Sequence, residues 1–278
     1  MKLRRWCIRR RGEGVSVNAI CTAAQIPRRT FYNWWNRYGE AGFENLADKS
    51  RRPNTIHKTS DETVNRIINL RKETGWCPHR IAGYLRKNSI DVCHMTVYRI
   101  LCQEGLNHPL QKPRNKRTYK HWQRRHSNSL WQCDLKLTDA KWLITILDDH
   151  SRFITASQVF KQGTAENVIG LFDKAIHEYA KPTEILTDHG SQFWSVRKGE
   201  SSFQAYCIDN RIKHILGGIG KPTTLGKIER WFRTYDQEHI RFQLHRKFIE
   251  YYNYERPHMS LNYKTPAEVY FSNVPNVL

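Results

Sequence analysis

The sequence pattern changes at about residue 128, and this change constrains the fold more than any other feature of the chain. Residues 1–127 hold 27 Lys and Arg but 9 Asp and Glu, a net charge of +18. Residues 128–278 hold 19 Lys and Arg and 17 Asp and Glu, a net charge of +2. Apolar residues recur at helical spacing in the first part, whereas the second part opens with alternating strand patterns. A basic helical region joined to a nearly neutral α/β region predicts a polyanion-binding part attached to a different kind of domain.

A segment at residues 16–38 has the pattern of two short helices joined by a turn. The second helix carries an aromatic stripe at i, i+3, i+4 and i+7, formed by Phe31, Trp34, Trp35 and Tyr38. Its opposite face is polar and rich in arginine. This is the layout of a helix-turn-helix, whose second helix enters the major groove of DNA. We therefore expect DNA contacts from Arg28, Arg29, Asn33 and Arg37.

A second helical segment runs from Thr59 to Leu106 and has the same basic character. Its last helix turns apolar residues inward and leaves Thr96 and Arg99 free to face DNA. Between the two segments lies a polar, proline-containing linker with Arg51 and Arg52, which either enter a minor groove or stay solvated. A second linker, after residue 106, is acid-free and interleaves Lys and Arg with aromatic residues, which favours phosphate contact.

The second part of the chain predicts three strands, a helix and a fourth strand, which indicates an α/β domain with a mixed sheet. Asp134 falls within the first strand, and Asp188 ends the fourth. Glu229 lies near the start of a later helix, at the edge of its buried face. These three carboxylates can converge on one edge of the sheet, although spacing alone leaves open that they are unrelated acids. Asp148 and Asp149 are interpreted as outward-facing turn residues.

Three blocks of the sequence, "WQCDLK", "ILTDHGSQF" and "GKPTTLGKIERWFRTY", resemble the catalytic blocks of DDE transposases and retroviral-type integrases. The stretches "GFENLADKSRRPN" and "YYNYERPHMSLNYKTPAEVY" are similar to bacterial and archaeal insertion-sequence transposases. The resemblance covers nearly the whole chain. It implies an α/β ribonuclease-H-like core, with a mixed five-stranded sheet and helices, preceded by two all-α helix-turn-helix domains.

The resemblance also implies the chemistry. Asp134, Asp188 and Glu229 would be the catalytic residues and the ligands of two Mg²⁺ or Mn²⁺ ions, which prefer hard oxygen donors. The enzyme would cut the ends of a transposon and join them to target DNA, acting on double-stranded DNA as a homo-oligomer. Two other functions remain open: a DNA-binding transcriptional regulator with an inactive integrase-like core, and a plain metal-dependent nuclease.

Two features depart from the family pattern. Asp188 and Glu229 have 40 residues between them, several more than is usual, and the extra residues are expected in the loop "WSVRKGESS". Asp236 stands seven residues after Glu229, where the family often has Lys or Arg. Arg233 could provide that basic DNA contact instead. Lys227 is expected either to hold a DNA phosphate or to lie on a solvated helix face.

The expected domains are a helix-turn-helix domain at 1–53, a second one at 54–106, a basic linker at 107–127, the catalytic core at 128–245 and a tail closing the core at 246–278. The sequence contains no apolar run long enough to span a membrane and no apolar segment near the N-terminus typical of a secretory signal. Its seven cysteines include no C-x-x-C pair. We therefore expect a cytoplasmic protein without membrane partners, associated with the nucleoid through DNA.

Overall fold

The computed structural model describes residues 1–48, 50, 58–107, 122–195, 199, 201–218 and 225–272. The chain forms two compact units, Met1–Lys58 and Thr59–Leu278. Arg51 and Arg52, predicted to contact DNA, lie outside the described residues, as does most of the second basic linker.

The first unit contains α1 (Lys2–Gly12), α2 (Val17–Ala24) and α3 (Arg28–Ala41), followed by the 3₁₀ turn η1 (Gly42–Leu46). The Ser16 hydroxyl caps α2 by accepting from the Ala19 N–H. Gln25, in the left-handed region at φ 52°, ends α2 and allows the turn into α3. The core is formed by Cys7, Ile20, Cys21 and Phe31. The helix α1 was not predicted because its basic sequence has little amphipathic period.

The second unit begins with three further helices, α4 (Asp61–Thr74), α5 (Pro78–Lys87) and α6 (His94–Gln103). The Ser60 hydroxyl caps α4, and Pro78 occupies the first position of α5, where its missing N–H costs nothing. The predicted inward residues of α6, Val97, Ile100 and Leu101, are buried. They pack against Ile67 of α4 and against α5, as a helix-turn-helix bundle requires.

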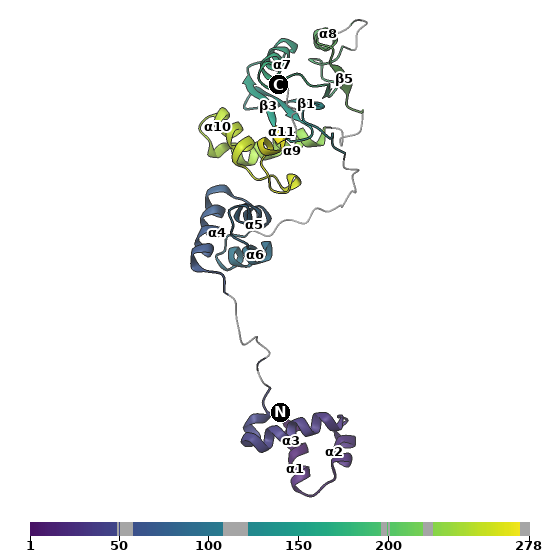
Figure 1. Ribbon diagram of the computed structural model, residues 1–278, viewed down its shortest axis with the longest axis vertical. Coiled ribbons are helices and arrows are strands. Elements are labelled where there is room, and N and C mark those ends of the chain that lie inside the picture. The colour runs from purple at the N-terminus through teal and green to yellow at the C-terminus, as the bar shows by residue number, and fades with distance from the viewer. Residues whose placement is uncertain are drawn as a thin grey trace. The chain divides into compact units, whose positions relative to one another are not determined.

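The core of the second unit is a five-stranded sheet in the order β3-β2-β1-β4-β5 (Figure 1). Its strands are β1 (Leu130–Thr138), β2 (Lys141–Asp148), β3 (Ile154–Phe160), β4 (Glu184–Thr187) and β5 (Lys213–Leu216). The first three strands pair antiparallel, and β4 and β5 extend the sheet in parallel with β1. The predicted mixed, ribonuclease-H-like sheet is thus confirmed.

Helices cover both faces of this sheet. The helices α7 (Ala165–Tyr179) and α8 (Ser202–Asp209) pack on the face that carries Trp131 and Cys133. The helices α9 (Gly226–Glu238) and α10 (His245–Glu250) pack on the opposite face, against Leu143 and Leu147. Because side chains alternate along a strand, the even-numbered residues of β1 point toward the α9 face. Asp134 is one of them.

The tail continues through η2 (His239–Arg241), the π-helical turn η3 (Tyr251–Glu255), the 3₁₀ turn η4 (Met259–Leu261) and α11 (Pro266–Ser272). It packs on the core, where Tyr270 of α11 stacks on Phe153. It also contacts the three helices α4 to α6, here called the second helical module, where Trp76 Nε1 donates a hydrogen bond of 2.9 Å to the Tyr251 hydroxyl. A Cβ on Gly83 of α5 would lie 2.3 Å from the Tyr263 ring, so this close approach requires glycine. No described helix is long and apolar enough to cross a membrane.

Candidate active site

Asp134 and Asp188 lie level with each other on neighbouring strands. The parallel pairing of β1 with β4 matches Leu130 with Glu184 and Gln132 with Leu186, and the same offset aligns Asp134 with Asp188, just past the last pair. Leu186 and Asp188 are on the same side of β4, as Gln132 and Asp134 are on β1. Residues level on adjacent strands of one sheet are separated by about 4.8 Å in the backbone. The register therefore brings both carboxylates to the α9 face of the sheet.

Both aspartates have a backbone partner that fixes their orientation. The Asp134 carboxylate accepts a 2.7 Å hydrogen bond from the Leu135 N–H. The Asp188 carboxylate accepts a 2.9 Å bond from the Gly190 N–H and so closes the turn after β4. Asp188 therefore has the capping role of an ordinary strand-end aspartate. One oxygen of each carboxylate remains available for a ligand.

Glu229 comes from α9, which packs against β1. Its side chain is exposed, one position after the buried Ile228. The next turn of the same helix carries Arg233, also exposed. Asp236, the departure from the family pattern, forms an ion pair with Lys136 of β1. Lys136 follows Asp134 by two residues and shares its face, so a basic group does lie beside the carboxylates, although sequence reasoning did not identify it.

The three carboxylates act on each other electrostatically. The pKa of Asp134 is raised to about 7, chiefly by burial; the Leu135 N–H bond opposes this shift, and the charges of Asp188 and Glu229 add to it. None of the three forms an ion pair with a residue that the structure describes. The nearby Lys136 pairs with Asp236 rather than with any of the three, and oxygen donors of this kind suit Mg²⁺ or Mn²⁺. Among the described residues, however, no group of three or more His, Cys, Asp or Glu side chains is close enough to hold an ion.

The expectation that Asp148 and Asp149 face outward is wrong, because both are fully buried. Asp148 accepts hydrogen bonds from the Asn128 and Ser151 N–H groups, each 2.8 Å long. Asp149 accepts from the Arg124 N–H and from Gln132 Nε2, also at 2.8 Å. Donors distant in sequence thus compensate the burial of both charges. The polar Gln132, within an otherwise apolar stretch of β1, was the available signal.

Lys227 completes this buried network. Its ammonium forms an ion pair with Asp149 and lies 4.4 Å from the centre of the Trp122 ring, and its side chain is 14% exposed. Burial and the nearby Arg152 charge lower its pKa to about 8. The alternative that Lys227 lies on a solvated helix face does not fit this burial, and its contact with a DNA phosphate stays a prediction. Lys227 instead ties the first turn of α9, which carries Glu229, to the end of β2.

The predicted DNA contacts of the first unit differ in their placement. Arg28, Arg29 and Asn33 are exposed on α3, as expected for residues that face a groove. Arg37 is not: its guanidinium donates to the carbonyl of Asn45 at 2.5 Å and to that of Ala47. The expectation that Arg37 stays outside is therefore wrong, because it holds η1 against α3. On α6 of the second unit, Arg99 is exposed and Thr96 is half-buried.

Residues 124–222 match the family described as "Integrase core domain", and residues 210–266 match a second family with the same description. Residues 4–54 match the family "Helix-turn-helix domain", and residues 30–101 match "Homeodomain-like domain". The chain carries an integrase core preceded by helix-turn-helix domains. Asp134 and Asp188 fall within the first integrase-core match, and Glu229 falls within the second.

Two relatives match most of the length of this chain. The "Transposase for transposon Tn552" of Staphylococcus aureus is 25% identical over 270 residues, which cover 80% of this chain and 52% of that one. The "Putative integrase ORF3" of Spiroplasma virus SpV1-C74 is 25% identical over 296 residues, covering 85% of this chain and 78% of that one. This chain thus spans about half the length of the Tn552 transposase.

Solved structures are also similar to this integrase-core chain. One is the simian T-cell lymphotropic virus intasome in complex with PP2A regulatory subunit B56 gamma, with a TM-score of 0.46, 18% identity and 76% of each chain covered. Another is the HTLV-2 integrase catalytic core domain in complex with magnesium, with a TM-score of 0.40, 24% identity, and coverage of 52% of this chain and 98% of that one.

Proposed function

We propose that this protein is a transposase that binds the ends of its mobile element and carries out divalent-metal-dependent DNA cleavage and strand transfer. One observation carries the proposal: Asp134 and Asp188 are level on adjacent parallel strands, and Glu229 raises the pKa of Asp134 from the helix that packs on that face. The integrase-core matches and the similarity to a transposase support it.

In this proposal the three carboxylates are metal ligands rather than an acid–base pair. Two bound Mg²⁺ or Mn²⁺ ions would supply activation of the attacking oxygen and stabilisation of the leaving oxygen at phosphorus. The Leu135 and Gly190 N–H groups hold Asp134 and Asp188 in orientation, and the Lys227–Asp149 pair holds the start of α9. No covalent intermediate with the protein is required.

The domains have separate tasks in this proposal. The helix-turn-helix regions, expected at 1–53 and 54–106, would bind the transposon ends, with Arg28, Arg29 and Arg99 exposed for this purpose. The core at 128–245 would cut and join, and the tail at 246–278 would close it. We expect a homo-oligomer to assemble on DNA, so that two ends are held in one complex.

The test replaces Asp188 with Asn, which keeps the oxygen that accepts from Gly190 but removes the charge. Cleavage and strand transfer on a labelled end duplex, in Mg²⁺ and in Mn²⁺, should both fall by orders of magnitude, because the same site serves both steps. Binding to the same duplex should persist. The matched control is Asp139→Asn, which removes a charge from the exposed β1–β2 turn and should retain activity.

The outcomes separate the alternatives. Cleavage without joining by the parent protein would indicate a plain metal-dependent nuclease. Binding without either reaction would indicate a DNA-binding regulator with an inactive core. Near-parental activity of Asp188→Asn would remove this residue from the site and leave it only its turn-capping role. The end duplex for these assays is taken from inverted repeats in the DNA that flanks the gene.

A further inference from the structure

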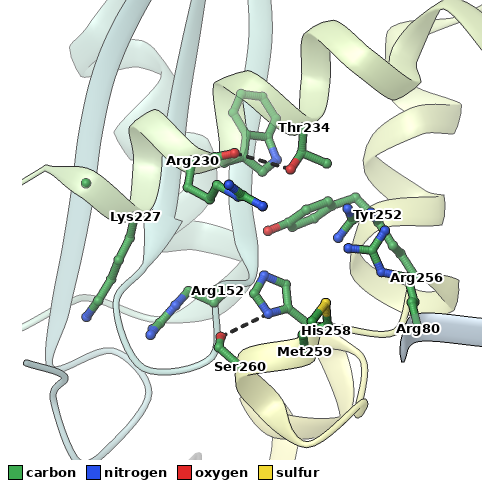
Figure 2. A pocket seen from close by; sticks show the side chains of 12 residues that line it. Arg80, Arg152, Lys227, Arg230, Thr234, Tyr252, Arg256, His258, Met259 and Ser260 are labelled. Carbon is green, nitrogen blue, oxygen red and sulfur yellow. Dashed lines mark hydrogen bonds between the residues drawn. The ribbon is translucent and has the colours of Figure 1, made fainter. Parts of the chain in front are cut away.

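A second, basic site lies beside α9, the helix that carries Glu229. It is a cavity of about 320 Å³ between α9, the loop after η3 and the second helical module (Figure 2). Lys227, Arg230 and Thr234 line it at helical spacing, whereas Glu229 and Arg233 are not among its lining residues. Its cationic lining residues are Arg80, Arg152, Lys227, Arg230 and Arg256.

The positive charge in this cavity exceeds the negative charge around it. None of the described residues that line the cavity is acidic. Glu238 accepts two hydrogen bonds from Arg256, at 2.7 and 2.8 Å. It also forms an ion pair with Arg80 at 3.6 Å. Asp149 is paired with Lys227. Arg152 donates hydrogen bonds to the Asp149 and His150 carbonyls and to Gln123 Oε1, near the charges of buried Asp148 and Asp149. Arg230 forms no ion pair with any described residue.

The neighbouring groups respond to this excess. Burial, together with the charges of Arg256, Arg152, Arg80 and Arg230, lowers the pKa of His258 to about 3. The imidazole therefore stays neutral and receives a bond from, or donates one to, the Ser260 hydroxyl at 3.0 Å. A cluster of cations in which Arg152 and Arg256 are buried is costly unless an anion joins it.

Donors without acceptors also line the cavity. The indole of Trp231 is 1% exposed, and its Nε1–H has no hydrogen-bond acceptor among the described residues. The Nε–H of Arg80 is likewise buried without an acceptor in the described part of the chain. Figure 2 shows the Arg230 guanidinium and the Tyr252 ring projecting into the space above His258. The cavity thus offers buried donors and forked guanidinium groups to a ligand that supplies only acceptors.

We propose that this cavity binds a phosphate group of the DNA strand, an inference that rests on the DNA binding of the proposed function. Phosphate accepts hydrogen bonds at every oxygen and matches the geometry of guanidinium groups. The volume is at the small end of the range for ligand sites, about 300–1,000 Å³, and allows a phosphate with its adjoining sugar. A strand held there would touch the helix that carries Glu229 and a residue, Arg80, of the second helical module.

The first test is thermal unfolding of the full chain in inorganic phosphate, compared with chloride at equal ionic strength. Phosphate should raise the melting temperature of the parent by about 2–6 °C through binding linkage. Arg230→Gln should lose most of this rise, because it removes an exposed cavity cation without an ion pair. Arg233→Gln removes the same charge from the same helix but outside the cavity, and should keep the rise in melting temperature caused by phosphate. Equal responses from both variants, or no response from the parent, would overturn the site.

A second variant tests the site in the opposite direction. Ser260→Asp places a fixed negative charge at the exposed rim of the cavity, beside His258. It should raise the melting temperature in phosphate-free buffer and remove the response to phosphate, because the charge substitutes for the ligand. A lower melting temperature with an unchanged phosphate response would show that the cavity does not need an anion.

Binding to the end duplex identifies the source of the phosphate. If the strand provides it, Arg230→Gln should weaken DNA binding and lower the slope of log affinity against log salt by about 1. Loss of the phosphate response with unchanged DNA binding would assign the cavity to a free phosphate compound and overturn the strand assignment. A parent that responds to phosphate but neither cuts nor joins DNA would refute the proposed function alone, whereas an active parent without this response would refute the cavity alone.

Discussion

Replacing Asp134 with Asn should make the metal-free protein more stable at neutral and alkaline pH. The carboxylate is half-buried on the α9 face beside the charges of Asp188 and Glu229, and its pKa rises from 3.8 to about 7. Folding therefore disfavours its charged form. The amide has nearly the same shape, and its oxygen can still accept the hydrogen bond from the Leu135 N–H, so the substitution removes little but the charge.

The magnitude follows from the two pKa values. At about 1.4 kcal/mol for each tenfold difference in proton affinity, they correspond to about 4 kcal/mol, an upper limit because residual solvent contact screens the charge. A folded-state pKa above the unfolded value means that the folded state binds the proton more tightly. The stability of the parent therefore falls as pH rises through about 4 to 7 and is level above that window. The increase in the free energy of unfolding caused by Asp134→Asn should be small at about pH 4.5 and close to its maximum at about pH 8.

The assay is urea unfolding of the full chain with EDTA, followed by tryptophan fluorescence at these two pH values. A gain of 3–4 kcal/mol would move the midpoint by about 1 M urea, given a slope near 3 kcal/mol/M for a unit of this size. Asp139→Asn, in the exposed β1–β2 turn, is the control and should leave the midpoint unchanged. No gain in stability from Asp134→Asn at the higher pH, or the same gain at both pH values, would show that the folded state does not disfavour the Asp134 charge.

Three further results are expected. Replacing both Arg28 and Arg29 with Ala should weaken end binding and lower the slope of log affinity against log salt by about 2. Replacing the exposed Arg246 and Lys247 with Ala also removes two charges but should leave end binding unchanged. Fluorescence anisotropy over a salt series measures both effects. Arg37→Ala should destabilise the first unit by about 2–3 kcal/mol, because two carbonyls lose a charged donor, and amide hydrogen exchange in residues 1–48 should show it. Tyr251→Phe leaves Trp76 Nε1 without its 2.9 Å hydrogen-bond partner and should lower the free energy of unfolding of the second unit by about 1–2 kcal/mol. An unchanged melting temperature would contradict this.

Several parts of the protein follow from local sequence patterns. The helical spacing that turns Val97 and Leu101 inward predicts α6, and alternation predicts β1 with Asp134 within it. The three sequence blocks also identified the acids that are now proposed as ligands. These predictions succeeded because periodicity within one element is set by the helix or strand geometry of neighbouring residues.

Other features were decided only by the tertiary structure. Asp148 and Asp149 form a polar, turn-like stretch in sequence, yet they are buried because Asn128, Gln132 and Lys227 supply their hydrogen bonds from other elements. The level placement of Asp134 and Asp188 depends on the register between β1 and β4, which no local pattern encodes. The basic cavity likewise joins Arg80, Arg152 and Arg256, each of which alone resembles an ordinary surface arginine. The sequence by itself determined which residues each helix and strand presents, and the packing of elements far apart in the chain determined which of them meet, because burial and charge depend on distance in space rather than along the chain.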